Sequence, residues 1–226
     1  MRIPGDAFLL HRALNLPSHV VVFDYSAACS GFIGGLYLAY SLMRAGHEHV
    51  LLVNADTYSY LMGWDETDRE NRLLFGDGEA VTKLRPKVGS APIYLYTDGK
   101  GALDFQINLL TDTLEMNGKG ILEFVMREVP LLVREIVRRD NSTMDDIDLF
   151  VFHQASKVTL DFLFKKLKIP PEKQFTNLER IGNTVSASIP IALRDAELQG
   201  RLHNGMKVLI AGFGSGLSWG GCIIDW

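Results

Sequence analysis

The feature that most constrains the fold is the stretch 20–43, in which a single cysteine separates two apolar segments. The β-branched and aromatic run at 20–24 predicts a buried strand. From residue 31 onward, apolar side chains recur at helical spacing on nearly every face, which predicts a buried helix. Cys29 is therefore expected at a tight turn between a strand and the first turn of a helix.

That position suits a reactive thiol. N–H groups in the first turn of a helix lack partners and carry a partial positive charge, so they favour the thiolate over the thiol. Free N–H groups beside the sulfur could also hold the oxyanion of a thioester under attack. The alternative at this point is that Cys29 is a small, inert core residue. A matching base elsewhere in the chain is needed to separate the two.

Composition excludes several classes of protein. The chain has 226 residues, a net charge of −4 and two cysteines, Cys29 and Cys222. It has no general basic surface for nucleic acid or an anionic membrane. Two distant cysteines make neither a disulfide framework nor a metal-binding motif, so a reducing cytoplasm and no metal are expected. No signal peptide or membrane span is predicted, which favours a soluble protein.

The order of the segments predicts an α/β fold built from two related halves. In the first half, the strand at 20–24, the helix after Cys29 and a strand at 49–54 form a βαβ unit, which implies parallel pairing. The rest of this half is expected to contain a helix at 6–16, a loop at 63–72, strands at 79–85 and 92–97, and an irregular segment at 99–114.

The second half repeats the pattern of a strand that runs into a turn with one reactive residue, here His153. Because of this repetition we predict two domains, at 1–114 and 115–226, that face each other. The second is expected to contain helices at 117–140, 157–168 and 186–199, strands at 148–152, 207–211 and 219–226, and a glycine-rich turn at 212–216.

Three turns hold candidate chemistry, at Cys29, His153 and Asn183. A thiolate nucleophile works best beside an imidazole, and an amide side chain can donate to an oxyanion or orient a ligand. Each also has a structural alternative, because Asn183 after Gly182 is typical of a turn and His153 could be a core histidine. The turn at 212–216 lacks the full spacing of a dinucleotide-binding loop.

Five strings, in order and at matching spacing, resemble the β-ketoacyl-acyl-carrier-protein synthase III family. They are Ser26-Ala-Ala-Cys29-Ser-Gly-Phe, Phe75-Gly-Asp-Gly78, His153-Gln-Ala, Gly182-Asn183-Thr184 with Ser188-Ile-Pro190, and Gly212-Phe-Gly-Ser-Gly-Leu-Ser-Trp219. The resemblance covers almost the whole chain.

The resemblance implies a thiolase-like fold with a Cys-His-Asn site and no cofactor. Cys29 would take an acyl group from acyl-CoA. His153 and Asn183 would then bind the thioester carbonyl of malonyl-acyl-carrier-protein and stabilise the enolate formed by decarboxylation. The backbone N–H groups of Cys29 and Ser215 would form a second oxyanion hole. Asn183 argues against the elongating Cys-His-His synthases and the hydroxymethylglutaryl-CoA synthases.

The resemblance also implies partners. Arg69 would contact the CoA nucleotide, while Gln154, Lys157 and the pair Lys165–Lys166 would lie where the acidic carrier protein docks. A homodimer in the cytoplasm that initiates fatty-acid synthesis is expected. Two departures from the family pattern are Val158, where an arginine is usual, and Ser215, where many members have glycine.

Two alternatives stay open. Val158 favours an acyltransferase of the same fold that serves secondary metabolism with a non-malonyl acceptor. The chain also begins later than the family pattern, so the first half is expected to be N-terminally incomplete. That favours a truncated, inactive chain or a subunit that needs a complementary partner.

Overall fold

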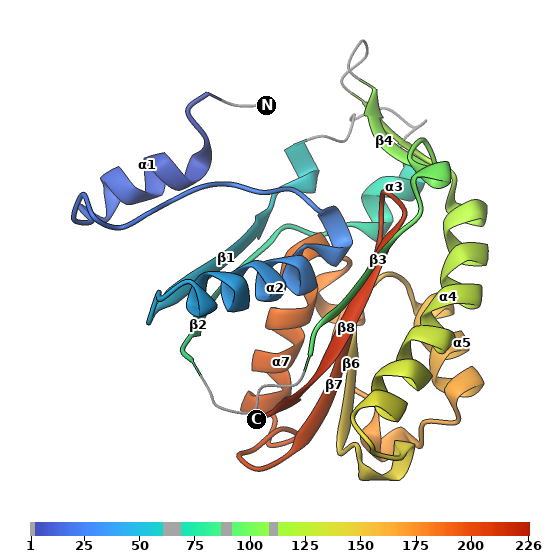
Figure 1. Ribbon diagram of the computed structural model, residues 1–226. Coiled ribbons are helices and arrows are strands. Elements are labelled where there is room, and N and C mark those ends of the chain that lie inside the picture. The colour runs from blue at the N-terminus through green and yellow to red at the C-terminus, as the bar shows by residue number, and fades with distance from the viewer. Residues whose placement is uncertain (1–2, 61–68, 87–91, 109–112) are drawn as a thin grey trace.

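The computed structural model describes residues 3–60, 69–86, 92–108 and 113–226. A four-stranded sheet forms its centre (Figure 1). The strand order is β3 (Tyr94–Thr97), β8 (Ser218–Asp225), β7 (Lys207–Gly214) and β6 (Leu149–Phe152). β6 runs parallel to β7, and the other two pairs are antiparallel. Helices therefore have to cover both faces of β6 and β7, which are buried along almost their whole length.

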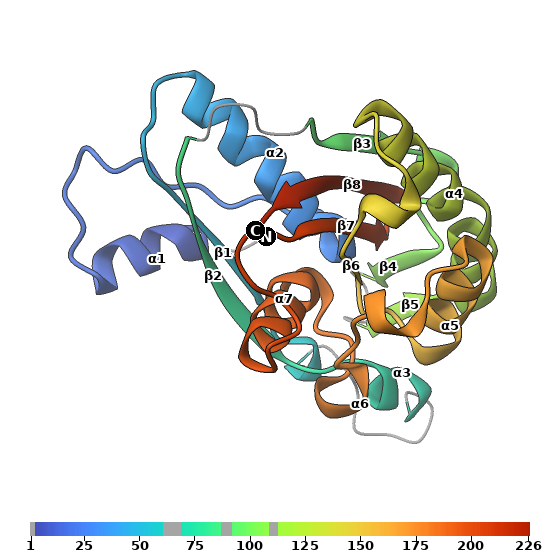
Figure 2. The same ribbon diagram turned by 90° about the horizontal axis from the view of Figure 1, so that it is seen from below.

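Alternate side chains of β6 enter two separate cores. Phe150 and Phe152 pack with α4 (Gly118–Arg139) and α5 (Lys157–Leu167). Leu149 and Val151 pack on the opposite side with α2 (Gly31–Arg44) and α7 (Ser188–Leu198). Figure 2 shows the sheet between these two pairs of helices. The two-residue period of the strand thus produces a layered α/β core from one continuous apolar run.

The first half departs from the predicted βαβ unit. β1 (Val50–Asp56) pairs antiparallel with β2 (Gly78–Leu84) rather than parallel with a strand at 20–24. Residues 21–27 are not in a strand, and Val21 is 67% exposed. The prediction of a strand at 20–24 is wrong because β-propensity alone does not supply the hydrogen-bonded neighbour that a strand requires.

Two further segments differ from expectation. The irregular segment predicted at 99–114 contains β4 (Phe105–Asn108) and the start of β5 (Thr113–Met116). The two strands form an antiparallel pair too short to show clear alternation in sequence. The loop predicted at 63–72 ends in α3 (Arg69–Leu74), and its residues 63–68 lie outside the described part.

The glycine-rich turn is shorter than predicted. Residues 212–214 belong to β7, where Gly212 pairs with Gly220 and Gly214 pairs with Ser218. The segment around Cys29 packs directly against this end of β7, which requires glycine there. A Cβ added at Gly214 would lie 2.6 Å from the Cβ of Cys29.

The remaining segments of the second half form close to their predicted positions. α4 continues through Pro130, and α6 (Leu178–Ile181) is a short addition before the turn at Asn183. In the first half, α1 (Asp6–Ala13) contains no buried residue and extends away from the body of the molecule (Figure 1). β3 pairs with β8 across the predicted boundary at 114/115, and the division into two domains stays a prediction.

Candidate active site

Cys29 lies in a single turn, η1 (Ala28–Ser30), that leads directly into α2. Ala28 has a positive φ of 41°, which turns the chain sharply before the thiol. Cys29 is only 7% exposed, and the Cα of Gly214 approaches it closely enough that no side chain would fit there. The predicted turn at the start of a helix is thus present, and it packs against β7.

Burial raises the pKa of the Cys29 thiol to about 12, and the nearby carboxylate of Asp56 adds to this effect. The sequence favoured a thiolate stabilised by the helix N-terminus. That expectation is wrong, because burial has the largest effect on this pKa and raises it. The resting group is a neutral thiol, so its reaction requires a base close at hand.

His153 continues β6 beyond its last paired residue. Its backbone N–H donates to the carbonyl oxygen of Ala211 at 2.8 Å, and its ring contacts the Phe213 ring edge-on at 5.5 Å between centroids. The Nδ1 atom lies 2.6 Å from the hydroxyl oxygen of Ser188. Burial lowers the pKa of His153 to about 3, partly opposed by a backbone hydrogen bond at Val185. The imidazole is therefore neutral at physiological pH.

The Phe75-Gly-Asp-Gly78 loop holds the backbone of Asn183. The N–H of Asn183 donates to the Leu74 carbonyl at 2.9 Å, and the N–H of Gly76 donates to the Asn183 carbonyl at the same distance. A Cβ added at Gly76 would lie 2.1 Å from the carbonyl oxygen of Ile181, so only glycine fits. The loop thus fixes both peptide groups of the third candidate residue.

The Asn183 side chain is also held in place. Its Oδ1 accepts the backbone N–H of Val185 at 2.9 Å, which orients the amide so that its Nδ2 is left to donate. Nδ2 makes a long contact of 3.4 Å with the Ala155 carbonyl. Asn183 itself is 4% exposed. The amide is thus a fixed donor whose remaining N–H capacity is available for a ligand.

The three turns meet around the end of β7 and the turn η7 (Val185–Ala187). Val185 packs in one apolar cluster with Cys29, and its N–H is the group bound by Asn183. β7 contributes Phe213 against His153 and Gly214 against Cys29. A thiol, a neutral imidazole and an oriented amide from distant segments therefore share one buried region.

The other predicted site residues are not hydrogen-bonded to Cys29, His153 or Asn183 among the described contacts. Ser215 follows β7 directly, and its hydroxyl donates to the Phe105 carbonyl at 3.0 Å. Arg69 begins α3, and its side chain lies outside the described part. Lys157, Lys165 and Lys166 are exposed on α5, where Lys157 pairs with Asp161 at 3.0 Å.

The expectation that Gln154 contacts a carrier protein does not fit the structure. Gln154 is 0% exposed, and its amide is fully engaged inside the protein. Its Nε2 donates to the Phe152 carbonyl at 2.7 Å, and its Oε1 accepts from Thr176 and Asn177. These hydrogen bonds hold the residues on both sides of His153 in place. Gln154 therefore stabilises the position of the histidine and does not form part of a docking surface.

Sequence reasoning missed Ser188 and Asp56. Ser188 is the nearest hydroxyl to His153, and its position five residues after Asn183 in a small-residue turn was the available signal. Asp56 ends β1 and binds the turn η7 through Ser186. Its signal was a carboxylate at the carboxyl end of a predicted strand, where ligand sites of α/β proteins often form.

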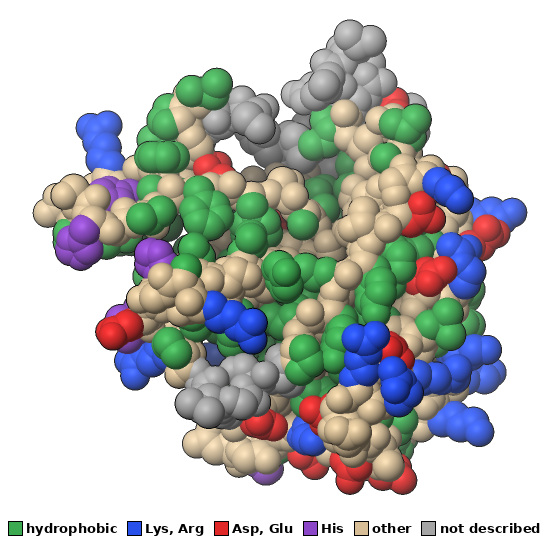
Figure 3. All heavy atoms as spheres, in the orientation of Figure 1, with side chains coloured by type: hydrophobic (Ala, Val, Ile, Leu, Met, Phe, Trp, Pro, Cys, Tyr) green, Lys and Arg blue, Asp and Glu red, His purple; other side chains and the backbone are tan. Residues whose placement is uncertain are grey.

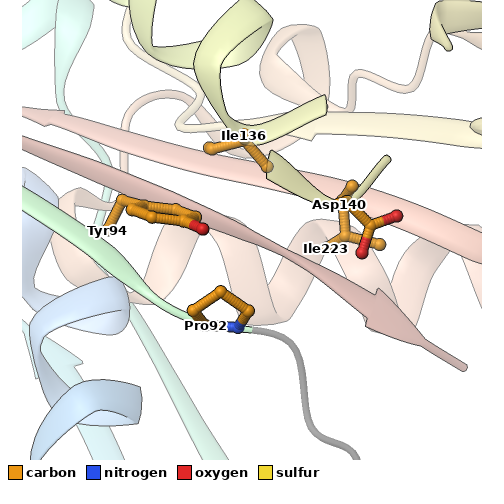
Figure 4. Close-up of a pocket in the computed structure, with 5 residues that line it drawn as sticks. All are labelled: Pro92, Tyr94, Ile136, Asp140 and Ile223. Atoms are coloured by element: carbon orange, nitrogen blue, oxygen red, sulfur yellow. The ribbon is translucent and has the colours of Figure 1, made fainter. Parts of the chain in front are cut away.

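Other features of the described residues lie outside this region. The shallow hollow in Figure 4 lies between the start of β3, β8 and the end of α4, and none of the three candidate residues lines it. Within the described ranges, no group of three or more His, Cys, Asp or Glu could hold a metal ion. No helix in those ranges has the length and apolar character needed to cross a membrane.

Two family models match the chain. The model for 3-oxoacyl-[acyl-carrier-protein] synthase III matches residues 23–101, and the model for its C-terminal part matches residues 137–226. The β-ketoacyl-[acyl-carrier-protein] synthase III of Clostridium beijerinckii is 36% identical over 100% of this chain and 74% of its own length. That of Acaryochloris marina is 36% identical over 98% of this chain and 72% of its own.

Solved structures agree. The synthase III of Pseudomonas aeruginosa PAO1 superposes with a TM-score of 0.94 at 32% identity, over 100% of this chain and 73% of its own. The priming β-ketosynthase of the R1128 polyketide pathway gives 0.86 at 29% identity, over 96% of this chain and 69% of its own. The fold and site define a thiolase-like condensing enzyme of the acyltransferase class. Within that class, the chain belongs to the 3-oxoacyl-[acyl-carrier-protein] synthase III family.

Proposed function

We propose that Cys29 is the nucleophile of this condensing enzyme and that His153 and Asn183 act on the second substrate. The observation that carries the proposal is the convergence of a buried thiol, a neutral imidazole and a fixed amide around η7 and the end of β7. Acyl-CoA would be the acyl donor and malonyl-acyl-carrier-protein the acceptor, in the initiation of fatty-acid synthesis.

In the first half-reaction, the sulfur of Cys29 attacks the thioester carbon of acyl-CoA. The thiol proton passes to His153 and then to the departing CoA thiolate, which leaves an acyl group on the enzyme. Because both groups are buried, a separated thiolate and imidazolium would be poorly stabilised. Proton transfer therefore accompanies the attack, and the N–H groups of Cys29 and Ser215 hold the oxyanion.

In the second half-reaction, the malonyl carboxylate leaves as carbon dioxide, and its electron pair forms an enolate on the thioester. For this step the single ring proton of His153 lies on Nε2, and Nδ1 accepts from the Ser188 hydroxyl. The enolate oxygen accepts hydrogen bonds from His153 Nε2 and Asn183 Nδ2, and the enolate carbon attacks the acyl group on Cys29, whose thiolate departs. The β-ketoacyl product leaves with the carrier, and the Cys29 sulfur takes up a proton from solvent. Two neutral, fixed donors suit this step because the charge appears only in the reaction.

The exposed lysines of α5 are the proposed docking surface for the carrier. Lys165 and Lys166 lie in its last turn, and Lys157 in its first. A row of ammonium groups attracts an acidic partner at a distance and raises its rate of association. Val158 is 63% exposed beside Lys157 and offers an apolar contact within the same surface.

A homodimer in the cytoplasm completes the proposal. Phe8 and Leu10 of α1 and Leu14 just after it are exposed, and Figure 3 shows hydrophobic side chains over this arm. Apolar surface of this kind is typical of a protein–protein contact, and a second copy is the proposed occupant. Both cysteines are free thiols, as a reducing compartment requires.

The proposal is tested by supplying acyl-CoA and malonyl-acyl-carrier-protein and measuring carbon dioxide and β-ketoacyl product together. Wild-type protein should release both in equal amounts. Asn183→Ala should lose about 100-fold or more in the condensation rate, the usual effect of removing one oxyanion donor. Acyl transfer to an acceptor without carbon dioxide would instead support the secondary-metabolism alternative, and equal rates in Asn183→Ala and wild type would contradict the assigned role.

A further inference from the structure

Asp56 is a carboxylate that the reaction described above does not use. It is the last residue of β1 and lies opposite Gly78 in the β1–β2 register. Its Oδ2 accepts both the backbone N–H of Ser186, at 3.0 Å, and the Ser186 hydroxyl, at 2.5 Å. A single carboxylate oxygen thus fixes the backbone and the side chain of one residue in η7.

Ser186 connects Asp56 with two parts of the candidate site. Its side chain packs on the start of α2, because a Cβ added at Gly31 would lie 2.8 Å from the Ser186 Cβ. Gly31 is two residues after Cys29. The preceding residue, Val185, donates its N–H to Asn183 Oδ1 at 2.9 Å. Through Ser186, Asp56 therefore supports the place where η7, which orients the Asn183 amide, packs against the start of α2, which follows Cys29.

The charge of Asp56 also acts on this junction. It contributes to the raised pKa of Cys29 and to those of Tyr58 and Tyr25, and burial raises the pKa of Asp56 itself. Among the described residues, the Asp56 carboxylate of β1 contributes to the raised pKa of Cys29, and Cys29 in turn contributes to the raised pKa of Tyr58.

We propose that Asp56 is a positioning residue of the condensing site, which binds Ser186 to hold the Asn183 turn on the start of α2, and that its carboxylate adds to the effect of burial in keeping Cys29 a thiol until substrate enters. This inference rests on the proposed function, since Cys29 and Asn183 are taken as the reacting groups. A protected thiol would resist adventitious alkylation and oxidation in the resting enzyme.

Two substitutions separate the charge from the hydrogen bonds. Asp56→Asn keeps an oxygen that can accept from Ser186 but removes the charge, whereas Asp56→Ala removes both. Asp146 offers a matched control, because its Oδ2 likewise accepts the N–H and the hydroxyl of one residue, Thr143, at 2.7 and 2.8 Å. Asp146 lies before β6 in η5 (Met144–Asp146), away from the candidate site.

The charge is tested by the rate of Cys29 alkylation with iodoacetamide between pH 7 and 10, in a Cys222→Ala background and without any substrate. Removing a negative charge lowers the pKa of the thiol, so Asp56→Asn should react faster at each pH. A lower pKa gives more thiolate, but each thiolate is a weaker nucleophile. The net gain in rate should be about threefold for each unit by which the pKa falls. Asp146→Asn should match the background. An Asp56→Asn profile that superposes on the background would overturn the proposed effect of the charge.

The positioning role is tested by amide hydrogen exchange over residues 182–189. Exchange should accelerate in Asp56→Ala, where the Ser186 N–H loses its acceptor, and stay near the wild-type rate in Asp56→Asn. Unchanged exchange in Asp56→Ala would overturn this role. If Asp56→Ala does not fold, the alkylation of Asp56→Asn still decides the charge. Neither measurement needs turnover, so a failure of the proposed condensation would be seen separately.

Discussion

Burial controls the protonation of Cys29 and His153, the two candidate reacting side chains. Cys29 and His153 are held as a neutral thiol and a neutral imidazole, with their pKa values moved to about 12 and about 3. The helix N-terminus predicted from sequence is present at Cys29, but hydration lost on burial is the larger effect. A neutral pair avoids two unpaired charges in the core and leaves His153 able to donate a hydrogen bond to an enolate.

The lowered pKa of His153 predicts a loss of stability in acid. Between pH 6.5 and pH 3 the unfolded chain binds a proton at this residue and the folded protein does not, so folding weakens as the pH falls. The free energy of unfolding should drop by about 2 kcal/mol from pH 7 to pH 5 through His153 alone. Urea unfolding at both pH values checks this, with His153→Gln as the comparison. An equal drop in that variant would contradict the assignment.

At the scale of elements, the second half was more predictable than the first. β6 and β7 are continuous apolar runs, and helices such as α5 have clear caps: the Ser156 hydroxyl accepts the N–H of Thr159. The segment 20–24 has equally strong β-propensity but no paired strand among the described residues, and a single sequence does not contain that information. β4 and β5 were missed because four-residue strands give too little periodicity.

The candidate site shows the same division. Cys29, His153 and Asn183 were chosen from sequence because each stands in a distinctive string, and their catalytic roles stay a prediction. Gln154 was misplaced on the surface, because burial depends on packing that its neighbours in sequence do not reveal. Asp56 was missed because its partner, Ser186, is 130 residues away in the chain.

Because β7 and η1 are in close contact, adding a methyl group at Gly214 is expected to slow the acylation of Cys29. Gly214→Ala would place a Cβ 2.6 Å from the Cβ of Cys29, so the thiol must move or β7 must bend. The variant should lose at least tenfold in the rate of Cys29 acylation, since small displacements of a reacting atom are costly. Acylation is followed by intact mass against time.

Gly99→Ala is the control for this effect, because nothing lies within 4 Å of a Cβ at that position. It should acylate at the wild-type rate. If Gly214→Ala acylated as fast as this control, the contact would have no bearing on the placement of the thiol.

At the scale of the whole molecule, the layered core contrasts with the exposed α1. No residue of α1 is buried, and Phe8 is 53% exposed. A helix of eight residues is marginal alone in water, so a partner is expected to cover its apolar side.

Substitution on α1 tests the proposed homodimer. Phe8→Glu together with Leu14→Glu should shift the protein from dimer to monomer in light scattering at micromolar concentration. Stability of the core should change little, because neither side chain enters it. His11→Glu provides a charge control on the same helix and should remain dimeric. A wild-type protein that is monomeric at these concentrations would refute the dimer.

The most direct measurement of the central claim is the intact mass of the protein after incubation with acetyl-CoA and, separately, with a longer acyl-CoA. Wild-type protein and Cys222→Ala should each gain the mass of one acyl group, while Cys29→Ala should gain none. Cys222 is buried in β8 and serves as the matched thiol. The absence of an adduct on wild-type protein, or an adduct that persists in Cys29→Ala, would contradict the assignment of Cys29 as the nucleophile.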